Sequence, residues 1–348
     1  MRLKPLPHPS TNHHRHHHRT PSSSRITNPS RPSPNPRSRE TVQLVHYSAT
    51  MPKEPEISLA EKTFVLEALK QNLRVDGRGI HSFREIELSF GDDYGFVDVR
   101  LGKTRVLARI SAEIVKPRSD RPFEGTFTIS TEMGPMASPS FEVGRPTDLD
   151  HTLSRLLEKS IRRSTALDLE SLCIVTGQRV WSLRADLHFL SHDGNLIDTA
   201  CIATITALAH FRLPVITVSG EDITIHPVTE RVPVPLSLLH WPICVTFSFL
   251  GEDEDGEVVC VLDATAQEEA LREGDMTVTV NKNGEVCQIS KSGGVAVEAE
   301  TLMKCARMAA EKVKGIDKLI ATALRDDEVA RNKGNLDWLK EGKSENER

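Results

Sequence analysis

The residues best placed for chemistry form the run Asp193-Gly194-Asn195, which precedes an apolar segment of small residues, 199–209. A polar glycine turn that opens a helix is a natural anion site, because unpaired backbone amides and the positive end of the helix dipole point at it. A phosphate-using enzyme normally adds a hydroxyl and a guanidinium to such a turn. Leu196 and Ile197 follow here instead. The pattern predicts a scaffold shaped for phosphate chemistry in which the residues that would hold the phosphate are apolar.

A second candidate is a row of cations on a helix that is expected after Asp150. Arg155, Lys159 and Arg162 stand at i, i+4 and i+7, so on an α-helix they form one stripe. The stripe lies beside an apolar face that is expected to pack on the core, formed by Leu153, Leu156, Leu157 and Ile161. Three cations on an otherwise acidic body suit the phosphate backbone of a nucleic acid. The alternative is that Glu158 pairs with Arg155 or Arg162 and the stripe is a solvated face.

The elements that must position these residues follow one order twice, strands and then helices. A capping-box pattern at Ser58-Leu59-Ala60-Glu61 predicts a first helix. Alternating patterns predict strands before the helix 196–210, at 86–90, 95–101, 104–114, 126–131, 171–175 and 180–190. A proline-rich segment precedes a second group of strands, at 244–250, 258–263, 276–281 and 286–290. Gly293-Gly294 then opens a long amphipathic helix, whose charged end is expected to fray. This order predicts an α+β fold of two similar halves.

Composition indicates a globular chain with a distinct first segment. Its 348 residues can bury a sizeable core, and its longest apolar runs are too short to span a bilayer. Residues 1–50 hold eight Lys and Arg against one acid, Glu40, so this segment carries +7 and the remainder −12. The acidic remainder excludes a generic polyanion binder. The segment 1–50 is predicted to be a disordered basic extension, although its composition also fits an organellar transit peptide.

The remaining boundaries expected are 51–215 for the first half, 216–324 for the C-terminal half and 325–348 for a charged tail. The six cysteines lack CxxC spacing, and several lie in apolar segments. They are therefore expected to be buried free thiols in a reducing compartment.

Four motifs, in a fixed order over 57–324, carry a resemblance to a known family. They are Arg74-Val75-Asp76-Gly77-Arg78, Ser138-Pro139-Ser140-Phe141-Glu142-Val143-Gly144-Arg145, Leu183-Arg184-Ala185-Asp186-Leu187 with Asp193-Gly194-Asn195, and Asp263 with Glu268-Glu269. With them the chain resembles the RNase PH family, and within it the non-catalytic ring subunits of the RNA exosome of the polymyositis/scleroderma autoantigen type. The resemblance implies an RNase PH-like fold that assembles into a six-membered ring.

The resemblance also implies what the candidate site does. Active members degrade RNA from its 3′ end with inorganic phosphate, and they need a D-G-G-[TS]-R loop, an upstream Arg and two Asp six residues apart. Asp193 and Gly194 match the loop, but Leu196 and Ile197 stand at its hydroxyl and Arg positions. Neither side chain can donate a hydrogen bond. The family pattern therefore predicts a non-catalytic subunit with a vestigial site.

The acidic pair of the family falls on Asp263 and Glu269. These two residues could sit near a metal ion. The favoured alternative is that Asp263 caps the following helix and that Glu269 is solvated or paired. No metal or cofactor is expected. An active phosphate-dependent 3′→5′ exoribonuclease, and a composite active site shared with a partner subunit, remain the alternative functions.

The resemblance names the partners as well. They are RNA, RNase PH-like ring subunits that pair into dimers of a hexameric ring, and RNA-binding cap subunits. Arg155 and Lys159 match two basic residues with which an inactive archaeal relative holds RNA, and Arg145 stands at the upstream Arg position. With Arg162 they form the expected RNA-binding set. The implied roles are RNA decay, including mRNA decay, and rRNA processing. The implied location is the cytoplasm and the nucleus, including the nucleolus, and no membrane partner is expected.

Overall fold

The computed structural model describes residues 57–345, except 143, 145, 220–221, 228–230, 253–257 and 295. These residues all belong to the compact unit Met51–Arg348. The extension expected over 1–50 lies outside the described residues.

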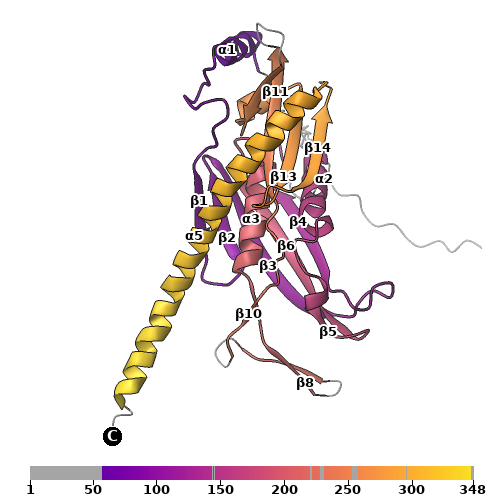
Figure 1. Ribbon diagram of the computed structural model, residues 1–348, viewed down its shortest axis with the longest axis vertical. Helices are drawn as coiled ribbons and strands as arrows, with labels where there is room; N and C mark the ends of the chain where they lie inside the picture. The colour runs from indigo at the N-terminus through magenta and orange to yellow at the C-terminus, as the bar shows by residue number, and fades with distance from the viewer. Residues whose placement is uncertain are drawn as a thin grey trace, which may run out of the picture. The chain divides into compact units, whose positions relative to one another are not determined.

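The first half is built on a mixed sheet of six strands (Figure 1). They are β1 (Ile86–Phe90), β2 (Phe96–Leu101), β3 (Thr104–Val115), β4 (Thr126–Met133), β5 (Cys173–Val175) and β6 (Arg179–Ser191). The order is β1-β2-β3-β6-β4, with β5 also paired to β6. The strand β4 runs parallel to β6, and the other pairs are antiparallel. A helix, α2 (Asp148–Leu157), and the π-helical segment η1 (Glu158–Arg163) that continues it pack on β4.

The second half is a four-stranded antiparallel sheet with the order β12-β11-β13-β14. Its strands are β11 (Ile243–Glu252), β12 (Val258–Leu262), β13 (Gly274–Val280) and β14 (Val286–Gly293). A short helix, α4 (Ala266–Leu271), joins β12 to β13, and the long helix α5 (Ala299–Glu345) follows β14. The shorter elements of the described residues are η2 (Glu170–Leu172), β7 (Arg212–Leu213), β8 (Ile216–Ser219), β9 (Asp222–Ile225) and β10 (Val234–Pro235).

The helix α3 (Leu196–His210) lies between the two sheets. It contacts β2 and β3 of the first sheet and β11 of the second, and almost all of its residues are buried. Its sequence explains this position, because alanine, threonine and cysteine leave room for backbone to approach on every side. One continuous hydrophobic core therefore joins both halves, with α3 at its centre.

The helix α5 covers the second sheet and reaches back to β1, as Figure 1 shows. Near the end of this contact the guanidinium of Arg331 donates to the carbonyl of Asp92 at 2.6 Å and lies 4.9 Å from the ring centroid of Tyr94. The carboxylate of Asp327 lies 2.6 Å from Arg331 and 3.2 Å from Nε2 of His210. These contacts hold α5, at Asp327 and Arg331, against the turn between β1 and β2 and the C-terminal end of α3.

The predicted α+β fold and its element order are confirmed. The first helix, α1 (Leu59–Lys70), begins with the predicted capping box between Ser58 and Glu61. Three expectations are wrong in detail. Thr147 caps α2, so this helix begins before Asp150. The helix α5 begins at Ala299, several residues after Gly293-Gly294. The described start of the tail, 325–331, is helical and docked rather than frayed.

Candidate functional site

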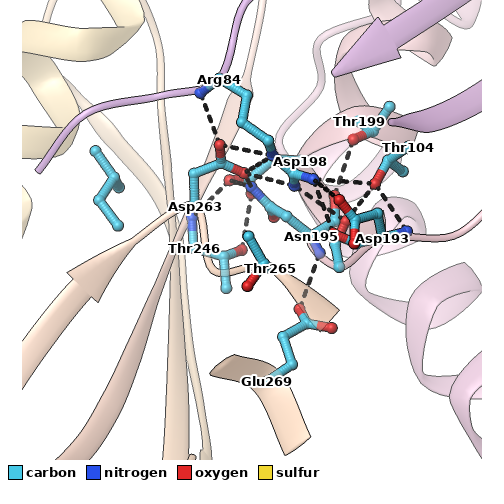
Figure 2. Close-up of polar contacts among 12 residues, drawn as sticks. Arg84, Thr104, Asp193, Asn195, Asp198, Thr199, Thr246, Asp263, Thr265 and Glu269 are labelled. Atoms are coloured by element: carbon cyan, nitrogen blue, oxygen red, sulfur yellow. Dashed lines mark hydrogen bonds and ion pairs between the residues drawn. The ribbon is translucent and has the colours of Figure 1, made fainter. Parts of the chain in front are cut away.

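The turn Asp193-Gly194-Asn195 lies at the N-terminus of α3, against the residues that follow β12 (Figure 2). Gly194 has a φ of +82°, and a Cβ at this position would stand 2.5 Å from the carbonyl oxygen of Ala264. The hydroxyl of Thr104 on β3 donates to the carbonyl of Gly194 at 2.7 Å. The backbone thus brings together the four residues of the expected vestigial site, Asp193, Gly194, Asp263 and Glu269.

Asp263 is fully buried, and guanidinium and amide groups surround its carboxylate (Figure 2). Arg84 donates from Nη2 to Oδ1 at 2.9 Å and from its backbone amide to Oδ2 at 2.8 Å. Arg78 donates to Oδ2 at 2.8 Å, and Nδ2 of Asn195 donates to Oδ1 at 2.7 Å. Burial would raise the pKa of Asp263, but the hydrogen bonds and charge of Arg84 outweigh it and hold the pKa below its ordinary value. The oxygens that a metal ion would need are committed to internal donors.

Glu269 occupies the anion position at the start of α3. Its Oε1 accepts the backbone N–H of Asn195 at 2.9 Å, and Asn195 is the residue that caps α3. Burial raises the pKa of Glu269, while the charge of Arg272, 3.4 Å away, and the Asn195 hydrogen bond oppose that rise. One backbone amide at the helix terminus that would attract a phosphate is therefore taken by a carboxylate of the chain itself.

The space beside this terminus is small and largely apolar. A cavity of about 60 Å³ lies there, and its walls include Leu196, Ile197, His192 and Arg272. Such a volume holds no more than a few water molecules. Leu196 is buried, with 5% of its surface exposed, and neither it nor Ile197 can donate to an anion. The arrangement keeps the shape of an anion site and lacks both of the expected donors.

The expected row of basic residues falls on two helical segments: Arg155 lies on α2, whereas Lys159 and Arg162 lie on the π-helical segment η1. Arg155 and Lys159 are exposed, and neither makes an ion pair within the described part of the chain. Arg162 pairs with Glu158 at 2.7 Å, so the solvated-pair alternative holds for Arg162 but not for Arg155. The wider turn from Glu158 to Arg163 also changes the register that an α-helix would have given. Arg145 lies outside the described residues.

Comparison with known proteins identifies the family and the fold. The chain matches domain 1 of the 3′ exoribonuclease family, RNase PH, over residues 82–214 and domain 2 of the same family over 240–312. The chain belongs to the RNase PH family. The family and the two-domain RNase PH-like fold that the motifs predicted are thereby confirmed.

The relatives of this RNase PH-family chain are exosome proteins, as the motifs predicted. It is 53% identical over 277 residues to the exosome complex component rrp45 of Schizosaccharomyces pombe, which covers 80% of this chain and 94% of that protein. It is 52% identical over 292 residues to the exosome complex component RRP45 of Saccharomyces cerevisiae, across 81% of this chain and 96% of the relative. The human RRP45 is 44% identical over 282 residues, across 81% and 63% of the two chains.

Solved structures with a similar fold are also chains of exosomes. A chain of the Archaeoglobus fulgidus exosome with RNA bound to the active site superposes with a TM-score of 0.64 at 27% identity, over 74% of this chain and 96% of the archaeal one. A chain of an archaeal exosome core superposes with a TM-score of 0.61 at 25% identity, over 75% and 96%. No helix in the described ranges is long and apolar enough to cross a membrane.

Several residues that shape the site could not be identified from the sequence. Arg84 carried no signal, because its partners Asp193 and Asp263 are far away in sequence and only the fold joins them. Arg78 lies in the first of the four family motifs, but nothing in that motif indicates its contact with Asp263. The expectation that Asp263 caps the following helix is wrong, since Thr265 caps α4. The expectation that Glu269 is paired is confirmed.

Asp198 is the other carboxylate at this terminus, and it is fully buried (Figure 2). It accepts hydrogen bonds from the hydroxyl of Thr246 at 2.7 Å, from the backbone N–H of Thr246 at 2.9 Å and from Nδ2 of Asn195 at 3.0 Å. Burial raises its pKa to about 7, against the lowering effect of these donors, and the nearby charge of Asp263 adds to the rise.

The raised pKa of Asp198 predicts a pH-dependent stability. Between the ordinary carboxyl pKa of 3.8 and the folded value of about 7, the folded chain binds more protons than the unfolded chain, so stability falls as pH rises through this window. We expect Asp198→Asn to flatten this dependence by about 1 kcal/mol per pH unit. Denaturant unfolding of both proteins at pH 5.5 and pH 7.5 measures the effect. The exposed Asp120→Asn serves as the control, and parallel profiles for Asp198→Asn and the native chain would contradict the assignment.

Proposed function

We propose that this chain is a non-catalytic ring subunit of an RNA exosome that scaffolds the particle and guides RNA during 3′→5′ decay and rRNA processing. Its partners are RNA, RNase PH-like subunits paired with it in a hexameric ring, and RNA-binding cap subunits. The identity to exosome components of two yeasts over most of their length supports this role. The particle acts in the cytoplasm and in the nucleus, including the nucleolus.

One observation carries the non-catalytic part of the proposal. The backbone N–H of Asn195 at the start of α3 is hydrogen-bonded to Glu269, and Leu196 and Ile197 stand where the family places its donors. Asp263, the other carboxylate of the family pair, is held by Arg84 and Arg78. A site that lacks both side-chain donors and places its own carboxylate at the helix terminus disfavours a second anion there.

The isolated full chain is expected to release no nucleoside diphosphates from single-stranded RNA in the presence of inorganic phosphate. Loss of one transition-state donor lowers a rate by about 10²–10³-fold, so loss of two places turnover below detection. Chromatography of nucleotides released with and without phosphate measures this, beside an active RNase PH-family enzyme as the positive control. Phosphate-dependent release of diphosphates by this chain would overturn the proposal and restore the exoribonuclease alternative.

The RNA-guiding part rests on Arg155 and Lys159. Both are exposed cations without an ion pair among the described residues, and they follow one another across the junction of α2 and η1. Unpaired cations can contact RNA phosphates without first breaking an internal bond. Arg162 is a weaker candidate because Glu158 already holds it. Arg145 keeps its proposed RNA contact from the family pattern alone. A composite active site, in which Arg155 or Lys159 serves a partner, would use the same surface.

Charge reversal tests this surface in the assembled particle. We expect Arg155→Glu with Lys159→Glu to weaken RNA binding by roughly tenfold and to reduce the salt dependence of binding by about two phosphate contacts, one for each cation removed. Binding titrations of single-stranded RNA at several salt concentrations measure both. Lys314→Glu, on the exposed face of α5, is the matched control. Equal affinities for the double variant and the control, with the particle intact, would remove the RNA contact and the composite site together.

We also propose a division of the chain near residue 215, with a first half over 51–215, a second half over 216–324 and a charged tail after it. The two domain matches, which end at 214 and begin at 240, support this division.

A further inference from the structure

Two cysteines that are distant in sequence meet where the second sheet packs against α5. The Sγ atom of Cys260 on β12 lies 3.7 Å from the Sγ atom of Cys305 on α5. Both are free thiols. Sulfur atoms in a disulfide are about 2 Å apart, so a bond between these two requires their side chains to move towards each other.

The two thiols differ in exposure and in acidity. Cys260 is partly exposed, whereas Cys305 is completely buried. The hydrogen bond between them raises the pKa of Cys260, and burial adds to that rise. The same bond lowers the pKa of Cys305 despite the opposing effect of burial. The pair therefore combines one thiol that a reagent can reach with a neighbouring thiol that favours the reactive thiolate.

We propose that Cys260 and Cys305 form a reversible disulfide when the chain meets a small-molecule disulfide such as oxidised glutathione. In the first exchange, the Cys260 thiol passes its proton to the Cys305 thiolate across their hydrogen bond, and the Cys260 sulfur attacks one sulfur of the reagent. A bond forms between these two sulfurs, and one glutathione thiolate leaves and takes up that proton from Cys305. In the second, the Cys305 thiolate attacks the sulfur of Cys260 and expels the second glutathione thiolate. The two cysteines together lose two protons and two electrons, and the reagent is reduced to two thiols. A reducing thiol pool reverses both steps.

The link would tie the strand that leads to Asp263 directly to α5. The loop that it closes runs from residue 260 to 305, and it contains Asp263, α4 with Glu269, β13 and β14. The carboxylates at the start of α3 would then be held by a covalent strap as well as by Arg84 and Arg78. Closing a loop of this length restricts the unfolded chain, so the oxidised protein should resist unfolding more than the reduced one. This inference is independent of the proposed function.

The test uses the full chain, reduced and then incubated with oxidised glutathione, followed by intact-mass analysis and non-reducing peptide mapping. We expect a species that has lost two hydrogens, a cross-linked peptide joining Cys260 to Cys305, and a rise in Tm of about 5 °C that a reducing thiol reverses. Cys305→Ser should accumulate a glutathione adduct at Cys260. Cys260→Ser should leave Cys305 unmodified, because Cys305 is buried.

Cys173 and Cys287 are the matched controls, since both are partly exposed and neither contacts another thiol. They should form glutathione adducts and no internal link. A native chain that carries only a glutathione adduct at Cys260, or that shows no change at either residue, would overturn the proposal. So would a Tm that is equal in the oxidised and reduced chains when the cross-linked peptide is present at full yield.

Discussion

Replacing Arg84 with alanine is expected to lower the free energy of unfolding by about 3 to 5 kcal/mol. The guanidinium makes two hydrogen bonds of 2.9 and 3.0 Å to the fully buried carboxylate of Asp263 and donates to the carbonyl of Asp193 at 2.8 Å. Its removal leaves a buried negative charge whose remaining ionic partner among the described residues is Arg78. Urea unfolding of the purified chain, followed by circular dichroism, measures the loss.

The control for this variant is Arg105→Ala. Arg105 also pairs with an aspartate, Asp98, at 2.7 Å, but 40% of its side chain is exposed. An exposed pair contributes less than about 1 kcal/mol. The double variant Arg84→Ala with Asp263→Asn should recover part of the loss, because it removes the unpaired charge. Equal effects of Arg84→Ala and Arg105→Ala would show that the internal ion pairs do not hold the site together.

Gly194→Ala is expected to destabilise the chain by about 3 kcal/mol, because it combines backbone strain with a collision. A Cβ at this position would stand 2.5 to 2.7 Å from backbone atoms of Ala264, Thr265 and Ala266, and φ is +82°. Neither the turn nor the start of α4 can move without disturbing Asp263. The thermal unfolding midpoint of the variant measures the cost.

Gly177→Ala separates the two contributions. Gly177 also has a positive φ, +74°, but no atom lies within 4 Å of a Cβ built there. Its replacement carries only the strain, about 1 kcal/mol. If both glycine variants unfold at the same temperature, the close approach between the turn and α4 contributes nothing.

Residues close together in sequence allowed the elements to be predicted well. The bounds of α3, 196–210, follow from a polar turn before an apolar run, and the capping box at Ser58 fixes the start of α1. The sequence was misleading where two signals compete. Asp150 looks like a helix cap, but Thr147 takes that role, and the side chain of Asp150 is buried inside α2. The π-helical turn that begins at Glu158 has no periodic signature.

The family pattern identified Asp263 and Glu269 but not what they contact. Their partners come from segments that the fold alone brings together: Arg84 precedes β1, and Asn195 caps α3. A linear motif contains the residues that the family's chemistry requires, but not the donors elsewhere in the chain that hydrogen-bond to them. That is why the absence of a hydroxyl and an Arg at Leu196 and Ile197 was visible in the sequence, whereas the internal neutralisation of the site was not.

The position of α3 has a consequence for how the chain can be dissected. This one helix packs against both sheets. A fragment that ends near residue 215 would therefore expose the face of α3 that packs on β11. A fragment that begins near residue 215 would lack the helix altogether. Either fragment would expose a large apolar surface to water and would therefore aggregate. Limited proteolysis should therefore yield an all-or-none loss of the intact species, because the two halves share one interior.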